Sequence, residues 1–362
     1  MLRNQVARTA IVETSECDLG LEPTARTPAA KLRIFFPGFD ERQRPVPLAH
    51  ACGLGKNPHG GYVFTRPGSW EELAGRVQTV FERVQSLGES DLVVYPHLFL
   101  ESATTRNIEE QAQGRNVPCV FFRNNDHPPS VHLRHGVVFQ EAVLASRKTH
   151  CEFPHPAVID DLAVGRDLTF RGYADRPTVS FCGNLGRGSL AEMFWRLRNY
   201  WKERHSGAAL RRAALKQCQS DPQVTTHFEL ARFARQPTER DELRERYIQS
   251  IADSDYVLCI RGAGNWSYRL YETLCLGRIP VFLNTDSLLP ASDVVDWKRQ
   301  CVWIEPRDFR RVPARIREYH AALTPETYQE IQRSNRSIWK EYLAPFAFWR
   351  RAIGDLVRRK QR

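Results

Sequence analysis

Hydrophobic and polar positions follow a repeating order along the chain, in which short apolar runs alternate with segments of helical periodicity. Lys31–Phe36, Asp91–Tyr95 and Val117–Phe122 are apolar runs bounded by polar or turn-forming residues, and they predict buried strands. Ser69–Leu87 repeats apolar residues every three or four positions and predicts an amphipathic helix. Strands and helices that alternate in this way are typical of a doubly wound α/β domain.

A second series of the same kind begins after a charged segment at 160–177, which we take as a linker. Thr178–Cys182 predicts its first strand, and a glycine-rich turn then precedes a helix over Ser189–His205. We expect α/β units at 31–170 and 178–340, an extension at 1–30, and a closing helix with a basic tail at 341–362. Further strands are predicted at Val224–Phe228, Tyr256–Ile260, Ile279–Leu283 and Val302–Ile304, and further helices at Thr105–Gly114, Glu239–Ala252, Ala314–Ala322, Pro325–Tyr342 and Phe346–Arg359.

The composition is that of a globular protein, with 42% hydrophobic and 26% charged residues. No apolar run approaches the ~18 residues that a membrane helix needs. The N-terminal residues lack the apolar segment of a secretory signal. The nine cysteines include no C-x-x-C pair, which argues against a disulfide framework or a zinc site and favours a reducing, cytoplasmic environment.

The chain is basic, because 52 Lys and Arg against 42 Asp and Glu give a net charge of +10. Such a charge suits an acidic partner: nucleotide phosphates, an anionic glycan, a membrane surface or nucleic acid. Much of the excess lies at 187–216 and 350–362, and a run of this kind is also usual for a solvated face. No motif that reads nucleic acid is present, so we expect no nucleic-acid partner. The basic tail is a candidate for peripheral contact with the inner face of a membrane.

The stretch 253–304 concentrates candidate chemistry at the ends of two predicted parallel strands. Arg261-Gly262-Ala263-Gly264-Asn265 forms a glycine-bearing loop between a strand and a helix. Glycines let a ligand approach the backbone, and a helix N-terminus presents unpaired N–H groups, so the loop suits a diphosphate. A tight turn without a ligand has the same composition.

Arg269 and Glu272 lie three residues apart on one face of that helix. They form either a surface ion pair worth a few tenths of a kcal/mol or two ligands of a nucleotide. In the second case the guanidinium matches phosphate oxygens, and the carboxylate accepts hydrogen bonds from the ribose hydroxyls. The pattern alone does not decide between them.

Other polar residues follow predicted strands. Gly183, Asn184 and Arg187 lie in the turn after Thr178–Cys182 and could add backbone donors and a cation to a diphosphate site, or form a plain turn. Asp286 lies in the polar loop after Ile279–Leu283. By contrast, the D-x-D spelling at 253–255 precedes its strand, so we expect no metal there.

Asp126 and His127 follow the strand Val117–Phe122 in the first unit. Polar groups at the carboxyl end of such a strand face the crevice of an α/β fold, and either residue could be a general base. Turn chemistry before Pro128 would explain the same residues without catalysis.

The run CIRGAGNWSYRLYETLCLGRIPVFL, from Cys259 to Leu283, resembles the exostosin family, glycosyltransferase family 47. The resemblance rests on S-Y-R-x-x-E-x-L, which begins at Ser267 and Tyr268, on G-x-I-P-V after it, and on L-P…W ending at Trp297. It is greatest to soluble bacterial and viral members. The chain departs from the family at Ala291, where Phe is usual, and in a shorter loop at 261–265.

The resemblance implies a GT-B fold, with two Rossmann-like domains facing a cleft and a C-terminal helix that crosses back to the first domain. The first domain would take the acceptor and the second a nucleotide-sugar donor, usually UDP-linked. It also implies inverting transfer without a metal or other cofactor, to an oligosaccharide, polysaccharide or lipid-linked acceptor, in polysaccharide or envelope glycan synthesis. Arg269 would then hold the diphosphate and Glu272 the ribose, with Arg261 and Arg187 nearby. The alternative is a non-catalytic glycan- or nucleotide-binding protein that keeps the fold.

Overall fold

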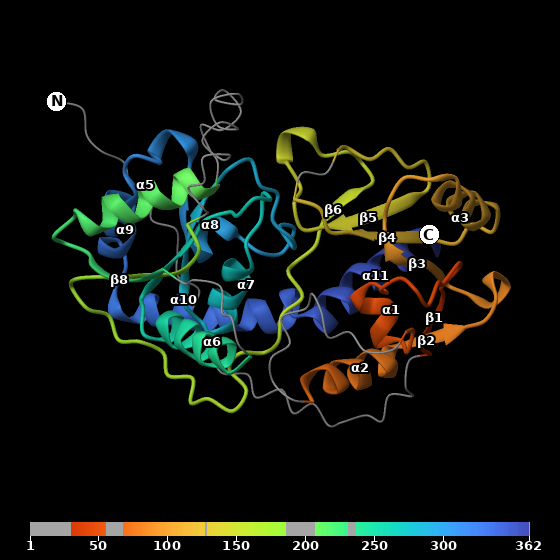
Figure 1. Cartoon of the computed structure of the whole chain (residues 1–362), viewed down its shortest axis with the longest axis horizontal. Helices are drawn as coiled ribbons and strands as arrows, with labels where there is room; N and C mark the ends of the chain where they lie inside the picture. The colour runs from red at the N-terminus through yellow and green to blue at the C-terminus, as the bar shows by residue number, and fades with distance from the viewer. Residues whose placement is uncertain (1–29, 56–67, 127–128, 186–206, 231–236, 362) are drawn as a thin grey trace, which may run out of the picture.

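The computed structural model describes residues 30–55, 68–126, 129–185, 207–230 and 237–361, and these form two halves that are each built around one parallel sheet (Figure 1). The extension predicted at 1–30 and the helix predicted over Ser189–His205 fall almost wholly outside the described residues. His127 and Arg187 also fall outside them.

The first half has a sheet of six parallel strands in the order β2-β1-β3-β4-β5-β6. The first five strands have the 2-1-3-4-5 order of a doubly wound fold, and β6 is added next to β5. Side chains alternate between its faces: Val94 and Val120 pack toward α2, whereas Val93 and Phe121 pack toward α3. The elements are β1 (Leu32–Phe35), α1 (Pro47–Ala51), α2 (Ser69–Val80), β2 (Phe81–Val84), β3 (Leu92–Leu98), α3 (Ala103–Gly114), β4 (Cys119–Arg123), β5 (Gly136–Gln140) and β6 (Glu152–Pro154).

The second half repeats this topology with five parallel strands in the order β11-β10-β9-β7-β8. Tyr256 and Leu258 face a core shared with α5 and α9, and Val257 and Cys259 face one shared with α6 and α7. The elements are β7 (Thr178–Gly183), α5 (Gly207–Gln219), β8 (Thr225–Leu230), α6 (Pro237–Ala252), β9 (Tyr256–Cys259), α7 (Tyr268–Cys275), β10 (Ile279–Leu283), α8 (Trp297–Gln300), β11 (Val302–Ile304), α9 (Val312–Ala321) and α10 (Pro325–Ile338).

The chain then returns to the first half. A π-helical turn at Trp339–Leu343 follows α10, and α11 (Pro345–Gln361) runs beneath the first sheet (Figure 1). Phe348 and Trp349 of α11 are buried in the core that contains Ile34. Two doubly wound sheets with a C-terminal helix that crosses back make a GT-B fold, as predicted.

Most predicted elements are confirmed, but one long helix was wrong. Ser69–Leu87 was expected to be helical throughout, whereas α2 ends at Val80 and Phe81–Val84 forms strand β2. Phe81 pairs in parallel with Leu32 of β1 and is 2% exposed. Pairing with β1 and burial of Phe81 therefore favour a strand over 81–84, although the apolar residues there are also spaced as in a helix. The helices α1 and α5 were not predicted.

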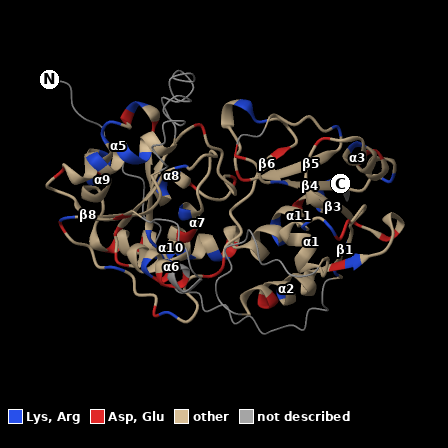
Figure 2. Ribbon diagram, viewed as in Figure 1, with Lys and Arg blue, Asp and Glu red and all other residues tan. Residues whose placement is uncertain are grey.

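The two halves touch along the loop after β10. Leu144 and Ser287 form an antiparallel bridge, and the N–H of Leu288 donates to the carbonyl of Val143 at 3.0 Å. None of the helices in the described part of the chain is both long and apolar enough to cross a membrane. Basic and acidic residues are interspersed along the ribbon of both halves (Figure 2).

Candidate active site

The centre of the second sheet is a topological switch point. From β7 the chain continues to β8 on one side, whereas from β9 it continues to β10 on the other side of the sheet. Ligands of open α/β sheets bind at the carboxyl ends of the strands at such a point. Gly183 is the last residue of β7 and Asn184 follows it, and the loop 261–265 follows β9. The structure thus brings together two segments that the sequence separates by about eighty positions.

Arg269 lies at this point, on the first turn of α7. Its guanidinium carbon is 4.3 Å from the centre of the Phe181 ring, and the side chain donates to the carbonyl of Cys182. It also reaches the carbonyl of Leu258 at 3.5 Å, and the residue is only 8% exposed. Gly183 leaves room for this arrangement, because a Cβ there would overlap Nη2 of Arg269 where it now lies. Arg269 therefore ties the ends of β7 and β9 together and places a cation between them.

Arg211 of α5 reaches the same point from the other face of the sheet. It donates to the carbonyl of Asn184 at 2.8 Å and to that of Ile260 at 3.1 Å. Burial lowers the pKa of Arg211 to about 10, and the positive charge of Arg269 adds to this effect. The guanidinium still carries its charge at neutral pH, so two cations lie near each other at the strand ends.

Glu272 is one turn further along α7 and is 2% exposed. Its carboxylate accepts a hydrogen bond from Arg244 Nη1 at 2.8 Å and another from the Tyr247 hydroxyl, both from α6. Burial raises the pKa of Tyr247 well above its ordinary value, and the charge of Glu272 raises it further. For Arg244, burial alone would lower the pKa, but the negative charge of Glu272 raises it. Two donors that the sequence had not suggested thus hold the Glu272 side chain in place.

The three guanidiniums of Arg211, Arg244 and Arg269 are here called the arginine cluster. Among the described residues, Glu272 accepts from one of them, and the buried Asp160 also raises the pKa of Arg244 by its negative charge. Each guanidinium also has buried N–H groups that find no partner among those residues: Nε of Arg211, Nε of Arg269, and both Nε and Nη2 of Arg244. Buried donors of this kind are costly unless something accepts from them. The cluster therefore suits a multivalent anion that can receive several charge-assisted hydrogen bonds.

The loop 261–265 borders the arginine cluster and turns tightly, with the N–H of Gly262 donating to the carbonyl of Trp266 at 3.4 Å. Arg261 is buried enough to lower its pKa, and its Nε has no partner among the described residues. Asn265 is bound through its side chain to Thr285 after β10. Ser267 is the N-cap residue of α7, although its hydroxyl makes no capping bond.

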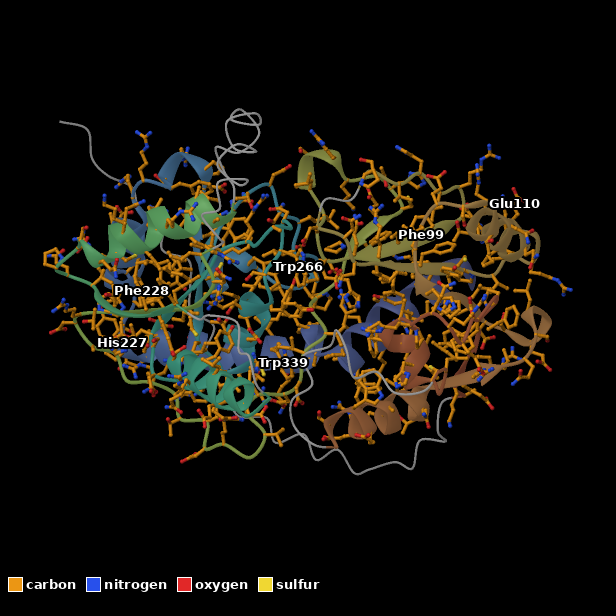
Figure 3. The ribbon with its side chains drawn as sticks, in the orientation of Figure 1. Phe99, Glu110, His227, Phe228, Trp266 and Trp339 are labelled. Carbon is orange, nitrogen blue, oxygen red and sulfur yellow. The ribbon has the colours of Figure 1, made fainter. Side chains whose placement is uncertain are left out.

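Asp126 reaches this loop from the first half. Its Oδ1 accepts a hydrogen bond from Trp266 Nε1 at 3.3 Å and lies against Gly264, where a Cβ would overlap it. The negative charge of Asp126 also opposes the lowering of the Arg261 pKa. Trp266 lies at the junction of the two halves (Figure 3). The predicted first-half carboxylate and the predicted second-half loop are thus in contact.

A cavity of about 250 Å³ opens between the halves next to this contact. Its walls come from the carboxyl ends of β3, β4 and β5 and, across the cleft, from Tyr268 of α7. We call it the cleft cavity, and it is lined by Arg44, Pro45, Pro47, Leu98, Phe122, Arg123, Asn124, Phe139, Glu141, His155, Val158 and Tyr268.

Other predicted positions have different surroundings. Asp286 does not face the arginine cluster; its carboxylate accepts from the N–H of Ser146 at 3.1 Å and from the Ser146 hydroxyl, so it joins the two halves. Asp255 is buried at the amino end of β9 and binds Arg171 and Tyr328, each at 2.7 Å.

The family model of the Exostosin GT47 domain matches residues 81–319. The chain belongs to the exostosin GT47 family. Among curated relatives, an Exostosin-1 homolog of Caenorhabditis elegans is 29% identical over 100 residues, which cover 28% of this chain and 25% of the relative. A probable glucuronosyltransferase of Oryza sativa is 34% identical over 62 residues, 17% of this chain and 15% of that protein. The chain therefore matches only a part of each of these relatives.

Several solved structures are similar to this chain at low sequence identity. HepE of Anabaena, solved in complex with UDP and glucose, is 13% identical with a TM-score of 0.39, over 91% of this chain and 100% of that one. CalG4, the calicheamicin glycosyltransferase, is 12% identical with a TM-score of 0.35, over 91% and 99% of the two chains.

Four residues around the candidate site were not among those predicted from the sequence. Arg211 lay in a basic run that reads as a solvated face, and Arg244 and Tyr247 lay in a helix rich in charges. The i, i+3 spacing of Arg244 and Tyr247 was the available signal, because it puts both on one face. Glu141 directly follows β5, so the strand-end rule that selected Asp126 applied to it equally.

Proposed function

We propose that this GT47 chain transfers a sugar from a nucleotide sugar, with UDP as the nucleotide, to a hydroxyl group of a glycan acceptor. The proposal rests above all on one observation, the arginine cluster with buried N–H groups that lack partners among the described residues, at the switch point of the second sheet. A diphosphate carries the charge and the acceptor oxygens that would satisfy this cluster. The donor would lie over Gly183 and the loop 261–265.

Different residues would bind the diphosphate and the ribose of the donor. Arg269 and Arg211 would hold the diphosphate, with Arg261 and backbone N–H groups of the Gly262–Gly264 loop beside it. Glu272 would accept hydrogen bonds from the ribose hydroxyls. A carboxylate has about four acceptor sites, so the two bonds from Arg244 and Tyr247 leave capacity for a ribose.

The chemistry would be an inverting displacement without an essential metal. The acceptor oxygen attacks the anomeric carbon from the face opposite the diphosphate, and the bond to the diphosphate breaks. Positive charge from the arginine cluster would stabilise the negative charge that develops on the leaving diphosphate, the task that a metal ion has in other transferases.

The acceptor would be an oligosaccharide, a polysaccharide or a lipid-linked glycan in polysaccharide or envelope glycan synthesis, and it would enter from the first half. For a lipid-linked acceptor, the tail could contact an anionic membrane through Arg358 and Arg359, which are exposed at the end of α11. Arg351 and Arg358 are already paired, with Asp293 and Asp355, so Arg359 would contribute most to such a contact.

The experiment is a donor screen with the purified chain. UDP-glucuronic acid, which the name of the Oryza relative suggests, is compared with UDP-glucose, UDP-N-acetylglucosamine, GDP-mannose and TDP-rhamnose. Nucleotide release is measured in EDTA and with added Mn²⁺ or Mg²⁺, and the anomer of the product is read by NMR. Release of UDP with product of inverted configuration in EDTA is expected. A strict requirement for added metal would refute the metal-free mechanism, and binding without turnover would favour the non-catalytic alternative.

The site assignment has its own test by calorimetry with UDP. Arg269→Ala should weaken UDP binding about 10- to 100-fold, because a charge-assisted hydrogen bond contributes about 1.5–3 kcal/mol. Arg211→Lys, which keeps the charge but loses the fork of donors, covers the case in which Arg269→Ala does not fold. The matched control is Arg333→Ala, since that exposed side chain binds Gln329 on α10. Unchanged UDP affinity in both site variants would show that the nucleotide binds elsewhere.

A further inference from the structure

The cleft cavity contains one acidic side chain, Glu141, at the carboxyl end of β5. Across the cleft is α7, the helix that carries Arg269 and Glu272. After burial, the negative charge of Glu141 is the next cause of the raised pKa of both Tyr268 and Tyr271. Glu141 is therefore within electrostatic reach of the donor helix while belonging to the opposite half of the molecule.

The other titratable groups of the cleft cavity do not suit a proton acceptor at neutral pH. His155 is buried, burial lowers its pKa to about 3, and its Nε2 already accepts from Trp349 Nε1 at 3.1 Å. Tyr268 is protonated at neutral pH, because burial raises its pKa to about 12. Arg123 is held by Gln140 and Glu152, and Arg44 is the remaining cation.

Asp126, the base predicted from the sequence, is in a different position. It is exposed, does not line the cleft cavity, and has one carboxylate oxygen bonded to Trp266. It contacts the loop 261–265 and influences the charge of Arg261. These contacts suit a residue that positions the loop 261–265, over which the nucleotide sugar would lie.

We propose that Glu141 is the catalytic base, which takes the proton from the acceptor hydroxyl that occupies the cleft cavity. This assignment rests on the proposed transfer from a nucleotide sugar. The Glu141 carboxylate removes the hydroxyl proton as the acceptor oxygen forms its bond to the anomeric carbon. The electron pair of the broken bond leaves with the diphosphate, and the protonated Glu141 then returns its proton to water.

The surroundings of Glu141 tune it for this step. Burial raises the pKa of Glu141 to about 8, and the negative charge of Asp126 contributes in the same direction. A base whose pKa lies near the working pH combines an adequate ionised fraction with a strong affinity for the proton. Among the described residues, the other titratable groups near Glu141 are Arg44, Arg123 and His155 in the lining of the cleft cavity, and Tyr268 and Tyr271 of α7.

The test compares Glu141→Gln with the wild-type chain, using the donor found by the screen. The substitution keeps the size of the side chain but leaves a group that cannot accept a proton, so kcat should fall about 10²- to 10⁴-fold, while the KM for the acceptor and the affinity for UDP change little. The wild-type kcat/KM should rise about tenfold from pH 7 to a plateau above pH 8, since only about a tenth of a group with pKa 8 is ionised at pH 7. This rise of kcat/KM with pH should be absent in Glu141→Gln and present again, at lower activity, in Glu141→Asp.

Two further variants keep the result interpretable. Glu110→Gln is the matched control, because Glu110 is exposed on α3 far from the cleft (Figure 3) and should keep wild-type kinetics. Asp126→Asn is the competing candidate. If Asp126→Asn loses turnover and the rise of kcat/KM with pH while Glu141→Gln keeps both, the assignment to Glu141 is overturned. If the wild-type chain transfers no sugar from any donor, the proposed function fails instead, and the two failures are distinguishable.

Discussion

Arg244 of α6 donates from Nη1 to Glu272 of α7 at 2.8 Å, and both side chains are largely buried. The carboxylate is therefore held in one orientation before any ligand arrives. Pre-positioned groups of this kind lower the ordering cost of binding. The guanidinium also gives the buried Glu272 side chain a charged hydrogen-bond partner, which offsets part of the cost of its burial.

Tyr247 is the second donor to Glu272, and Tyr247→Phe tests how much it contributes. Removing the hydroxyl leaves a buried carboxylate with one donor fewer, so the free energy of unfolding should fall by about 1–3 kcal/mol. UDP binding should weaken as well, because Glu272 loses its fixed orientation. Urea unfolding and calorimetry measure the two effects. Tyr319→Phe is the control: its hydroxyl donates to the Arg299 carbonyl near the surface, and a smaller loss of stability with unchanged UDP affinity is expected.

Gly207 allows close packing beneath the loop 261–265. A Cβ at Gly207 would overlap the carbonyl oxygens of Arg261 and Gly262, so Gly207→Ala must displace that loop. We expect both a loss of stability and a weaker affinity for UDP. Gly75→Ala is the matched control, because nothing lies within 4 Å of the added methyl group on α2. It should stabilise the chain by about 0.5–1 kcal/mol, as alanine does over glycine inside a helix. Equal behaviour of the two variants would contradict the packing argument.

Glu141 also makes stability depend on pH in a definite direction. Its pKa is raised from 4.5 to about 8, so the folded state favours the protonated form. The stability linked to this group is fully present below pH 4.5 and is lost as the pH rises through 8. Glu141→Gln removes the ionisation, so the variant should unfold at the same temperature as the wild type at pH 4.5 and at a higher one at pH 9. The difference is at most about 5 kcal/mol, since one pKa unit corresponds to about 1.4 kcal/mol. A constant difference across this range would contradict the raised pKa.

Trp349 fixes the returning helix α11 to the first half. The side chain is 1% exposed and donates to His155, so Trp349→Ala should cost about 3–5 kcal/mol of unfolding free energy. Trp349→Phe keeps much of the packing but leaves His155 Nε2 without its donor, and a loss of about 1–3 kcal/mol is expected. Denaturant unfolding measures both. Trp303→Ala, in a half-buried position on β11, should cost clearly less than Trp349→Ala.

The fold was largely predictable from local pattern. Strands such as Tyr256–Cys259 are short and apolar because both faces of a parallel sheet are covered, and this leaves a strong signal in one chain segment. The boundary at Val80 was not predictable, because the apolar residues of 81–84 fit a helix as well as a strand. Only pairing with β1, about fifty positions away, decides for the strand.

The sequence by itself determined the family, the two α/β units and the candidates Arg269 and Glu272, because each follows from residues that are close together in the chain. The tertiary structure alone decided which side chains surround those two. Arg211, Arg244 and Tyr247 come from helices whose sequences look like ordinary charged surface, and they reach the site because the doubly wound topology brings α5 and α6 to the same strand ends. Glu141 and Asp126 differ in the same way: both follow a strand, but their burial and charged neighbours depend on how the two halves meet, which no local pattern encodes.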